Sequence, residues 1–428
     1  MMNSCLRYTR HSAALATTAV AGSVFYNVVG SNQDSSSSSS FQHATTCEAK
    51  AQHHNQHQKS IPSSKPGTKL LFLGSGSSTG CPKPICALTF QQSLLSEEQQ
   101  HKFNPSLLQL QKDMEAKCGI SKIAIMGDPK LNKNYRNNPS LLISHRNNDD
   151  DCDSSSSSTT TSSPLRNVII DVGKTFREGA LRWMPHHGIY NIDGIVLTHE
   201  HADAILGLDD LRGFQIAPRM LKGGGTSMTP TVSLPIFLSP LCLETVKQVF
   251  SYLVPKELSE QEKRKVKEDA SKGIKVVRHV ASLDFQTVQF FQPFYAAGLK
   301  MIPLPVKHGE DLICNGYAFS VNGDKGKTIN VVYLSDISRM IPETEKYIME
   351  ELPPTDILVV DSLLYGKKHS VHYSLDQALE LVERLNAKKT FIVGMNCDDF
   401  PEHEDANRLI QERNPTVELA HDGLAIEF

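Results

Sequence analysis

The chain has 428 residues, of which 39% are hydrophobic, and its formal net charge is −3 at pH 7. This apolar content is enough for a sizeable core. With 44 Lys and Arg against 47 Asp and Glu, the chain lacks the basic surplus that general nucleic-acid binding requires. The nine cysteines are scattered, at positions 5, 47, 81, 86, 118, 152, 242, 314 and 397. They do not resemble a disulfide framework and indicate a core built for a reducing compartment.

The first 33 residues contain no Asp or Glu and carry Arg7 and Arg10. An acid-poor, Ser/Thr/Ala-rich start with arginines is typical of a mitochondrial transit peptide. A secretory signal is an alternative, because residues 19–21 (Ala-Val-Ala) resemble a cleavage site, and a merely disordered tail is another. The apolar stretch at 13–29 is short and diluted by polar residues, so a membrane span is disfavoured, and no later stretch suits one. We expect an organelle, with the mitochondrion favoured, and otherwise the cytoplasm.

Two low-complexity segments divide the chain. Residues 31–66 are rich in Ser, Gln and His and cannot form a core. We therefore predict a disordered tail with a possible targeting peptide at 1–66 and one domain at 67–428. A second run, residues 147–163, separates apolar segments at 140–143 and 167–170, which predicts a β-hairpin with an expanded loop. This run and a Gly-rich stretch at 222–226 are interpreted as loop insertions within one domain.

Short apolar runs recur along the predicted domain, and several end at a polar or metal-competent residue. Such runs are typical of buried strands. Side chains at strand ends are held by a rigid sheet while they reach one edge of it. The residues that end or follow these runs are Asp171, His199, His308, Asp336, Asp361 and Cys397.

Helical patterns alternate with the strands. The clearest helix is predicted over residues 374–386, where Ser374 and Gln377 form a capping box and apolar residues share one face. Weaker helices are predicted within 238–253 and 405–413. This alternation favours sheets covered by helices.

The segment Thr198-His199-Glu200-His201-Ala202-Asp203 directly follows one predicted strand. His-x-His alone is weak evidence of a metal site, because such pairs arise by chance in a chain with 17 histidines. The Asp two residues later and the preceding strand make the pattern more specific. Two imidazoles and a carboxylate that leave one turn can converge on a cation. A polar helix N-terminus whose histidines bind nothing is the alternative.

With Asp171, His308 and Asp336, this segment matches in order the motifs of metallo-β-lactamase-fold hydrolases. The glycine-rich opening at residues 71–80 resembles the first strand and turn of the branch containing tRNase Z and the phosphoribosyl cyclic phosphate phosphodiesterases. Residues 198–212 are similar to uncharacterised hydrolases of plants and fungi. The resemblance covers residues 69–428 apart from the insertions. It implies an α/β fold, a four-layer αβ/βα sandwich of two facing sheets, with the active site where strand ends meet.

The resemblance also implies a role for each matched residue. His199, His201 and His308 would ligate one divalent metal, for which zinc is expected. Asp336 would bridge to a second metal, and Asp203 would ligate that metal. Asp171 would orient the histidine turn through hydrogen bonds.

Two positions depart from the family's pattern. Ala204 stands where His-x-His-x-Asp-His ends in histidine, and Cys397 stands where a late histidine is expected. The second metal would then keep Asp203, Asp336 and, as a further ligand, the Cys397 thiolate, which suits zinc. A cysteine that is simply buried is the alternative at Cys397, and His403 is an alternative ligand. One metal site is predicted, and the second stays open.

The insertion after the first turn carries three further cysteines, Cys81, Cys86 and Cys118. Related phosphodiesterases hold a structural zinc in this region. The Cys-x-x-Cys spacing is missing here, so three ordinary thiols are expected.

The implied chemistry is hydrolysis by a metal-activated hydroxide, with Asp203 and His372 as catalytic residues. The segment around His372 resembles one whose histidine meets the scissile phosphate in tRNase Z-like and phosphodiesterase relatives, so His372 would protonate the leaving group. The arm with which tRNase Z grips RNA is not evident, so the expected substrate is a small phosphodiester or cyclic phosphate. The alternatives are a thioesterase or lactonase, which needs no such acid, and a metal-binding protein with little catalysis.

Overall fold

The computed structural model describes residues 67–93, 119–146, 164–220, 226–230, 233–254, 260, 261, 264, 268, 280–323 and 326–428. The chain divides into two units, Met1–Ile61 and Pro62–Phe428. All described residues belong to the second unit. The predicted targeting segment, the Ser-rich tail, Cys118 and the insertion at 147–163 lie outside the described residues. Within the described ranges, no helix is both long and apolar enough to cross a membrane.

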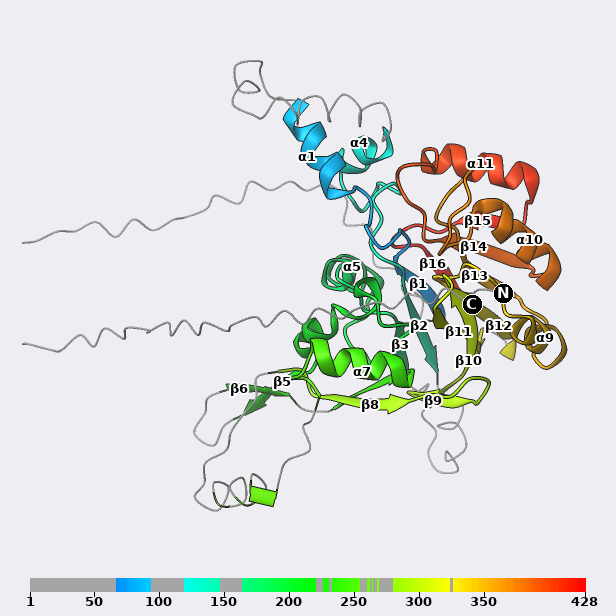
Figure 1. Ribbon diagram of the computed structural model, residues 1–428. Coiled ribbons are helices and arrows are strands. Elements are labelled where there is room, and N and C mark those ends of the chain that lie inside the picture. The colour runs from blue at the N-terminus through cyan, green and yellow to red at the C-terminus, as the bar shows by residue number, and fades with distance from the viewer. Residues whose placement is uncertain are drawn as a thin grey trace, which may run out of the picture. The chain divides into compact units, whose positions relative to one another are not determined.

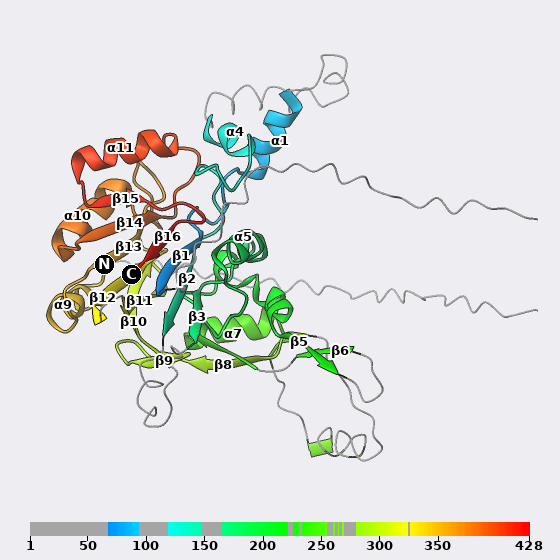
Figure 2. The ribbon, with the colours of Figure 1, turned by 180° about the vertical axis from the view of Figure 1, so that it is seen from behind.

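Two seven-stranded sheets lie at the centre of the second unit (Figures 1 and 2). The first has the order β16-β1-β2-β3-β4-β7-β8 and the second the order β15-β14-β13-β12-β11-β10-β9. The first sheet is built from β1 (Lys69–Gly74), β2 (Ser140–Arg146), β3 (Leu165–Ile170), β4 (Gly194–Val196), β7 (Leu234–Leu238), β8 (Leu283–Thr287) and β16 (Ala425–Glu427). The second is built from β9 (Phe294–Ala296), β10 (Leu299–His308), β11 (Leu312–Asn322), β12 (Thr328–Leu334), β13 (Ile357–Asp361), β14 (Lys389–Val393) and β15 (Val417–Leu419). A separate antiparallel pair consists of β5 (Ile216–Met220) and β6 (Thr226–Pro230).

The two sheets share one pairing plan. From β16 to β3 the neighbours in the first sheet are antiparallel, and from β3 to β8 they are parallel. From β9 to β12 the neighbours in the second sheet are antiparallel, and from β12 to β15 they are parallel. Each sheet therefore combines hairpins with crossovers, and helices cover the outer faces, as parallel strands require.

The helices form the outer layers on both sides of the sheet pair (Figure 1). On the first sheet lie α5 (Phe176–Trp183) and α7 (Pro240–Val249), and on the second lie α9 (Pro342–Glu350), α10 (Leu375–Leu385) and α11 (His403–Arg413). The remaining helices are α1 (Pro84–Ser93), α4 (Gly119–Ile125) and α6 (Ala202–Ile205), with short 3₁₀ segments at Pro185–His187 and Leu208–Phe214.

Strand alternation sorts the core into three layers. Leu70 and Phe72 of β1 pack between the two sheets, whereas Leu71 and Leu73 pack under the helices of the first sheet. Successive strand residues point to opposite faces, so a continuously apolar strand is buried on both sides. A third cluster fills the space between the second sheet and α9 to α11. The predicted four-layer sandwich is confirmed.

Most predicted elements are present, with shifted ends. The hairpin is confirmed: β2 and β3 pair from Leu141 with Ile170 to Arg146 with Leu165. The predicted helix at 374–386 is α10, with its capping box intact. The helix predicted at 405–413 begins two residues earlier, at His403. The strand expected before the histidine turn is only Gly194–Val196, because the chain then leaves the ladder to form the turn.

Candidate active site

Three imidazoles converge at one edge of the two sheets. His199 follows β4, His201 precedes the first turn of α6, and His308 is the last residue of β10. One ring nitrogen of each lies within 4.8 Å of the others. The ring centroids are 4.6 Å apart for His199 and His201, 5.4 Å for His199 and His308, and 5.2 Å for His201 and His308. The histidines predicted to ligate one metal are thus brought together from both sheets.

The protonation and hydrogen bonding of these three histidines suit the binding of a cation. The Nε2 atom of His199 is buried and has no hydrogen-bond partner, an arrangement that is costly unless a ligand completes it. Burial lowers the pKa of His199 to about 3, and burial also lowers the pKa of His308. The Nδ1 atom of His308 lies 2.7 Å from the Val371 carbonyl oxygen, which leaves Nε2 for a ligand. Neutral imidazoles with a fixed second nitrogen are the form that binds divalent metals.

Asp171 supports the turn that carries His199 and His201 through hydrogen bonds. Its carboxylate accepts hydrogen bonds from the Thr198 backbone NH at 2.8 Å and from the Thr198 hydroxyl at 2.7 Å. The same hydroxyl lies 2.8 Å from Nδ1 of His199. Asp171 itself has a positive φ of 61°, and its carbonyl accepts a bond from the Ser140 hydroxyl. The predicted hydrogen bonds between Asp171 and the turn are confirmed, and the Thr198 hydroxyl connects them to the His199 ring.

Two carboxylates stand beside the imidazoles. Burial, followed by the charge of Asp336, raises the pKa of Asp203 to about 7. Burial would also raise the pKa of Asp336, but its interactions with the His199, His372 and His308 imidazoles outweigh burial and lower this pKa. The absence of a side chain at Gly173 lets the Asp203 backbone approach it closely, because a Cβ at Gly173 would lie 1.8 Å from the Asp203 carbonyl oxygen. Asp336 offers an oxygen within 4.8 Å of ligand atoms of His308 and His372, whereas Asp203 belongs to none of the potential metal groups that the described residues form.

His372 and Asp361 form a hydrogen-bonded pair at the same edge. Nδ1 of His372 lies 2.7 Å from Oδ2 of Asp361 and 4.0 Å from Oδ1 of Asp336. Burial alone would lower the pKa of His372, but the charge and hydrogen bond of Asp361 raise it to about 9. Burial raises the pKa of Asp361 to about 6. At neutral pH the pair is therefore an imidazolium and a carboxylate.

Asp361 is the partner that sequence reasoning did not identify. In the sequence, Asp361 is recognisable only as a polar residue at the end of a predicted strand. The structure adds that Gly394 has a positive φ of 82° and that a Cβ there would lie 1.9 Å from Oδ1 of Asp361. The close approach of β14's end to β13's end thus shapes the pocket that holds this carboxylate.

His372 is held by the backbone around it. The Tyr373 NH donates to the Ile337 carbonyl at 2.7 Å, and the Leu363 NH donates to the Tyr373 carbonyl at 2.9 Å. One nitrogen of His372 lies within 4.8 Å of ligand atoms of His308 and Asp336. The predicted acid therefore lies beside the predicted metal ligands.

Cys397 and His403 are not brought to the imidazoles. The Cys397 thiol lies within 4.8 Å of the Cys86 thiol and an Asp398 carboxylate oxygen. His403 donates its backbone NH to Asn134 at 2.9 Å, and its ring neighbours that of His421. The reason is the path of the chain after β14: the Ser77 NH donates to the Met395 carbonyl at 3.2 Å, which draws this segment toward the loop after β1.

Ala204 stands where the family's pattern has a further histidine, and it is a buried core residue. Ala204 is 1% exposed and belongs to the core beneath the helices of the first sheet. Its carbonyl accepts the Val172 NH at 2.9 Å.

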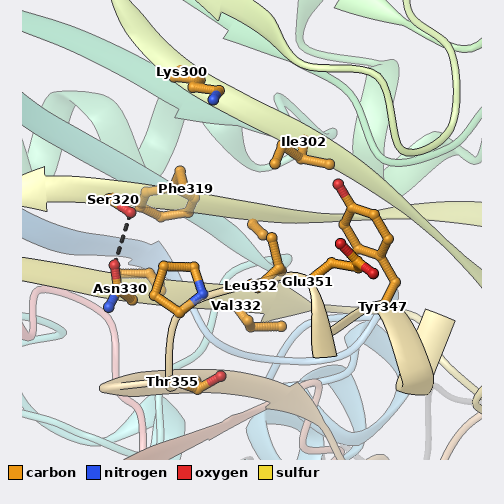
Figure 3. Close-up of a pocket in the computed structure, with 13 residues that line it drawn as sticks. Lys300, Ile302, Phe319, Ser320, Asn330, Val332, Tyr347, Glu351, Leu352 and Thr355 are labelled. Atoms are coloured by element: carbon orange, nitrogen blue, oxygen red, sulfur yellow. Dashed lines mark hydrogen bonds between the residues drawn. The ribbon is translucent and has the colours of Figure 1, made fainter. Parts of the chain in front are cut away.

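A cavity of about 320 Å³ lies elsewhere, over β10, β11 and β12 beside α9 (Figure 3). Lys300 and Ile302 line it from β10, and Tyr347 lines it from α9. Within it the Ser320 hydroxyl donates to the Asn330 side-chain oxygen at 2.9 Å. Lys300 is at the other end of β10 from His308, so this cavity is not part of the candidate site.

Comparison with known proteins agrees with this geometry. The family described as "Beta-lactamase superfamily domain" matches residues 166–395, more than half of the chain. A solved structure of a new diphosphatase from the PhnP family is 27% identical, with a TM-score of 0.52, and covers 84% of this chain and 98% of its own. Zn²⁺-bound PqqB from Methylobacterium extorquens is 14% identical, with a TM-score of 0.51, over 84% of this chain and 100% of its own.

One curated relative also matches. An octanoyltransferase of Porphyromonas gingivalis is 23% identical over 259 residues, which are 60% of this chain and 42% of that protein. The chain thus spans less than half the length of this relative.

Proposed function

The chain belongs to the β-lactamase superfamily, and from this we propose that it is a zinc-dependent phosphodiesterase acting on a small phosphodiester or cyclic phosphate. It is a hydrolase of the metallo-β-lactamase fold, a fold that implies a divalent metal. The identity of the metal and the preference for phosphodiesters are the proposed parts.

The observation that carries the proposal is the His372–Asp361 pair. A phosphodiester expels an alkoxide or phenoxide, which needs a proton, whereas a thiolate leaves readily without one. A partly buried imidazolium with a pKa of about 9 is suited to supply that proton. Its Nδ1 is bonded to Asp361, so Nε2–H is the proton available for transfer.

We propose that His199, His201 and His308 hold one metal and that Asp203 and Asp336 hold a second. When bound, the cations would lower the pKa of water and neutralise charge on the phosphoryl oxygens. Asp203, whose pKa is about 7, lies on the same turn as His199 and His201. The geometry gives no support to Cys397 as a ligand, so it is omitted from this set.

The related diphosphatase supports a phosphorus centre. That protein is 27% identical across most of both chains, and a diphosphatase cleaves a bond at phosphorus. The near-neutral net charge of this chain favours a small substrate over a nucleic acid.

The test compares substrates in a matched pair of variants. Metal-loaded full-length protein would be assayed on a 2′,3′-cyclic nucleotide, which expels an alkoxide, and on a thioester and a lactone. We expect turnover of the phosphodiester, and a loss of at least about 100-fold in kcat for His372→Ala. His369→Ala is the control, because that exposed ring lies 5.6 Å from His372 but has no link to Asp361.

Each outcome decides between functions. No phosphodiester turnover by fully metal-loaded protein refutes the proposal. Activity on a thioester that survives His372→Ala intact, or turnover of the lactone without turnover of the phosphodiester, favours the thioesterase or lactonase alternative. Bound metal without turnover of any substrate points to a metal-binding protein with little catalysis.

A further inference from the structure

Three buried thiols gather outside the imidazole site. Cys81, Cys86 and Cys397, here called the thiol cluster, are 2%, 7% and 1% exposed and pack with Ile120 and Ala124. None of the three is in a disulfide. The ligand atoms of Cys86, Cys397 and Asp398 lie within 4.8 Å of one another, although Cys86 and Cys397 are far apart in the sequence. Such proximity is not required by the active site described above.

A buried cation lies against this cluster. Arg136 is 1% exposed, and its Nε, Nη1 and Nη2 atoms have no hydrogen-bond partner. The Arg136 and Cys81 backbones are bonded to each other at 2.8 Å in both directions. Burial lowers the pKa of Arg136, whereas negative charge on Cys81, Asp422, Cys397 or Glu402 would raise it. A buried unpaired charge is costly, so the guanidinium favours an anion beside it, at these carboxylates or at a thiol.

Lys83 is a second cationic side chain beside the thiol cluster. Lys83 donates to an Asp398 carboxylate oxygen, and its charge acts on the thiols of both Cys86 and Cys397. Cys86 lies in the first turn of α1, where the helix dipole also favours a thiolate. Positive surroundings of this kind make cysteines nucleophilic.

A metal at the thiol cluster would compete with an existing ion pair. A divalent cation held by Cys86, Cys397 and Asp398 would displace Lys83 from Asp398. A disulfide between Cys86 and Cys397 leaves that ion pair in place.

We propose that Cys86 and Cys397 are a redox modification site at which hydrogen peroxide forms a reversible disulfide. The Cys86 thiolate, which is the more exposed of the two, attacks the peroxide. Its sulfur takes one oxygen as the O–O bond breaks, and the other oxygen leaves as hydroxide and becomes water with a proton. The Cys397 sulfur then attacks the Cys86 sulfenic acid, the S–S bond forms, and the displaced hydroxyl leaves as a second water with the Cys397 proton. Two thiols are oxidised and one peroxide is reduced to two waters.

The site is linked to the candidate active site through the segment after β14. The Asn396 NH donates to the Leu363 carbonyl at 3.2 Å, on the segment that leads to His372. Gly394 packs against Asp361. Drawing Cys397 to bonding distance from Cys86 would strain these contacts, so we expect the oxidised protein to lose activity.

The first experiment reads the covalent product and needs no substrate. Full-length protein would be treated with equimolar hydrogen peroxide, alkylated and mapped by mass spectrometry without reduction. We expect a linked peptide joining Cys86 and Cys397, two mass units below the sum of its parts, that dithiothreitol releases. Cys86→Ser should abolish this link. Cys242→Ser is the control, because burial raises the pKa of that thiol and it should leave the link unchanged.

The second experiment tests the role of charge. We expect Lys83→Met to slow the reaction of Cys86 with iodoacetamide at pH 7 several-fold, whereas Lys83→Arg, which keeps the charge, should react as the wild type does. Links of Cys81 to either partner, thiols no more reactive than Cys242, or a tightly bound metal that protects the cluster and is lost in Cys86→Ser would each overturn the proposal. None of these results depends on which ester the protein hydrolyses.

Discussion

The smallest unit of the proposed chemistry is one hydrogen bond, between Nδ1 of His372 and Oδ2 of Asp361. The carboxylate raises the pKa of His372 to about 9, so the protonated acid persists through neutral pH. An activity that depends on this acid is present below its pKa and is lost as the pH rises through it. The alkaline limb of the pH profile should therefore report the pKa of His372.

Asp361→Asn removes the charge that raises the pKa of His372. Burial, which lowers that pKa, would then be opposed only by the charges of Asp336 and Asp203, so the pKa should fall. We predict that the alkaline limb of kcat/KM moves to lower pH while the metal content stays the same. The measurement is a pH–rate profile on the cyclic nucleotide, whose alkoxide leaving group needs the acid. Asp376→Asn, at a surface carboxylate of α10 bonded to Arg413, is the control. An unchanged alkaline limb in Asp361→Asn would show that His372 is not the titrating acid.

Thr198 connects Asp171 to the His199 ring through its hydroxyl. Thr198→Val keeps the shape and the backbone bond to Asp171 but removes this connection. Loss of such a supporting contact typically lowers metal affinity by about 10–100-fold, and we predict a loss in that range. Competition with a chromogenic chelator measures it, with Thr328→Val at an exposed position of β12 as the control. Wild-type affinity in Thr198→Val would mean that the ring is held by packing alone.

At the scale of elements, the end of β14 shapes the pocket around Asp361. Gly394→Ala adds a Cβ at a φ of 82°, 1.9 Å from Oδ1 of Asp361. Backbone strain of this kind costs about 1–3 kcal/mol. We predict a lower free energy of unfolding by denaturant and a lower kcat, because Asp361 must move away from His372. Gly366→Ala, where a Cβ meets nothing within 4 Å, should change neither, and an equally mild effect at Gly394 would contradict the argument.

Strand ends were readable from sequence because a buried strand is continuously apolar and the first polar residue marks its end. Asp171, His199, His308 and Asp336 were found in this way, and the structure gathers them at one edge. Contacts between elements were not readable. The pairing of His372 with Asp361 depends on how α10 packs on β13, and the place of Cys397 depends on a hydrogen bond from Ser77 to Met395. No local pattern in the sequence encodes either distance.

At the scale of the whole second unit, the site belongs to neither sheet alone. His199, His201 and Asp203 follow a strand of the first sheet, whereas His308 ends a strand of the second sheet and Asp336 and His372 follow strands of it. Bonds across the interface fix their relation: the Asn315 NH donates to the Thr198 carbonyl at 2.9 Å, and the Tyr317 hydroxyl donates to the Leu197 carbonyl at 2.6 Å. Metal binding is therefore expected to stabilise the packing of the two sheets as well as the site.

The same layout predicts which part of the chain is dispensable. Arg146 and Leu165 are paired residues at the end of the β2–β3 hairpin, whereas Ser140, at the other end of β2, bonds to Asp171. Residues 147–163 therefore connect at the end of the hairpin away from the histidine turn. We predict that replacing them with a four-residue turn leaves metal content and kcat unchanged and shifts the free energy of unfolding by only about 1–2 kcal/mol, since loop-closure entropy depends weakly on length. Denaturant unfolding and metal analysis measure this, and a loss of metal or activity would show that the segment is part of the functional domain rather than an insertion in it.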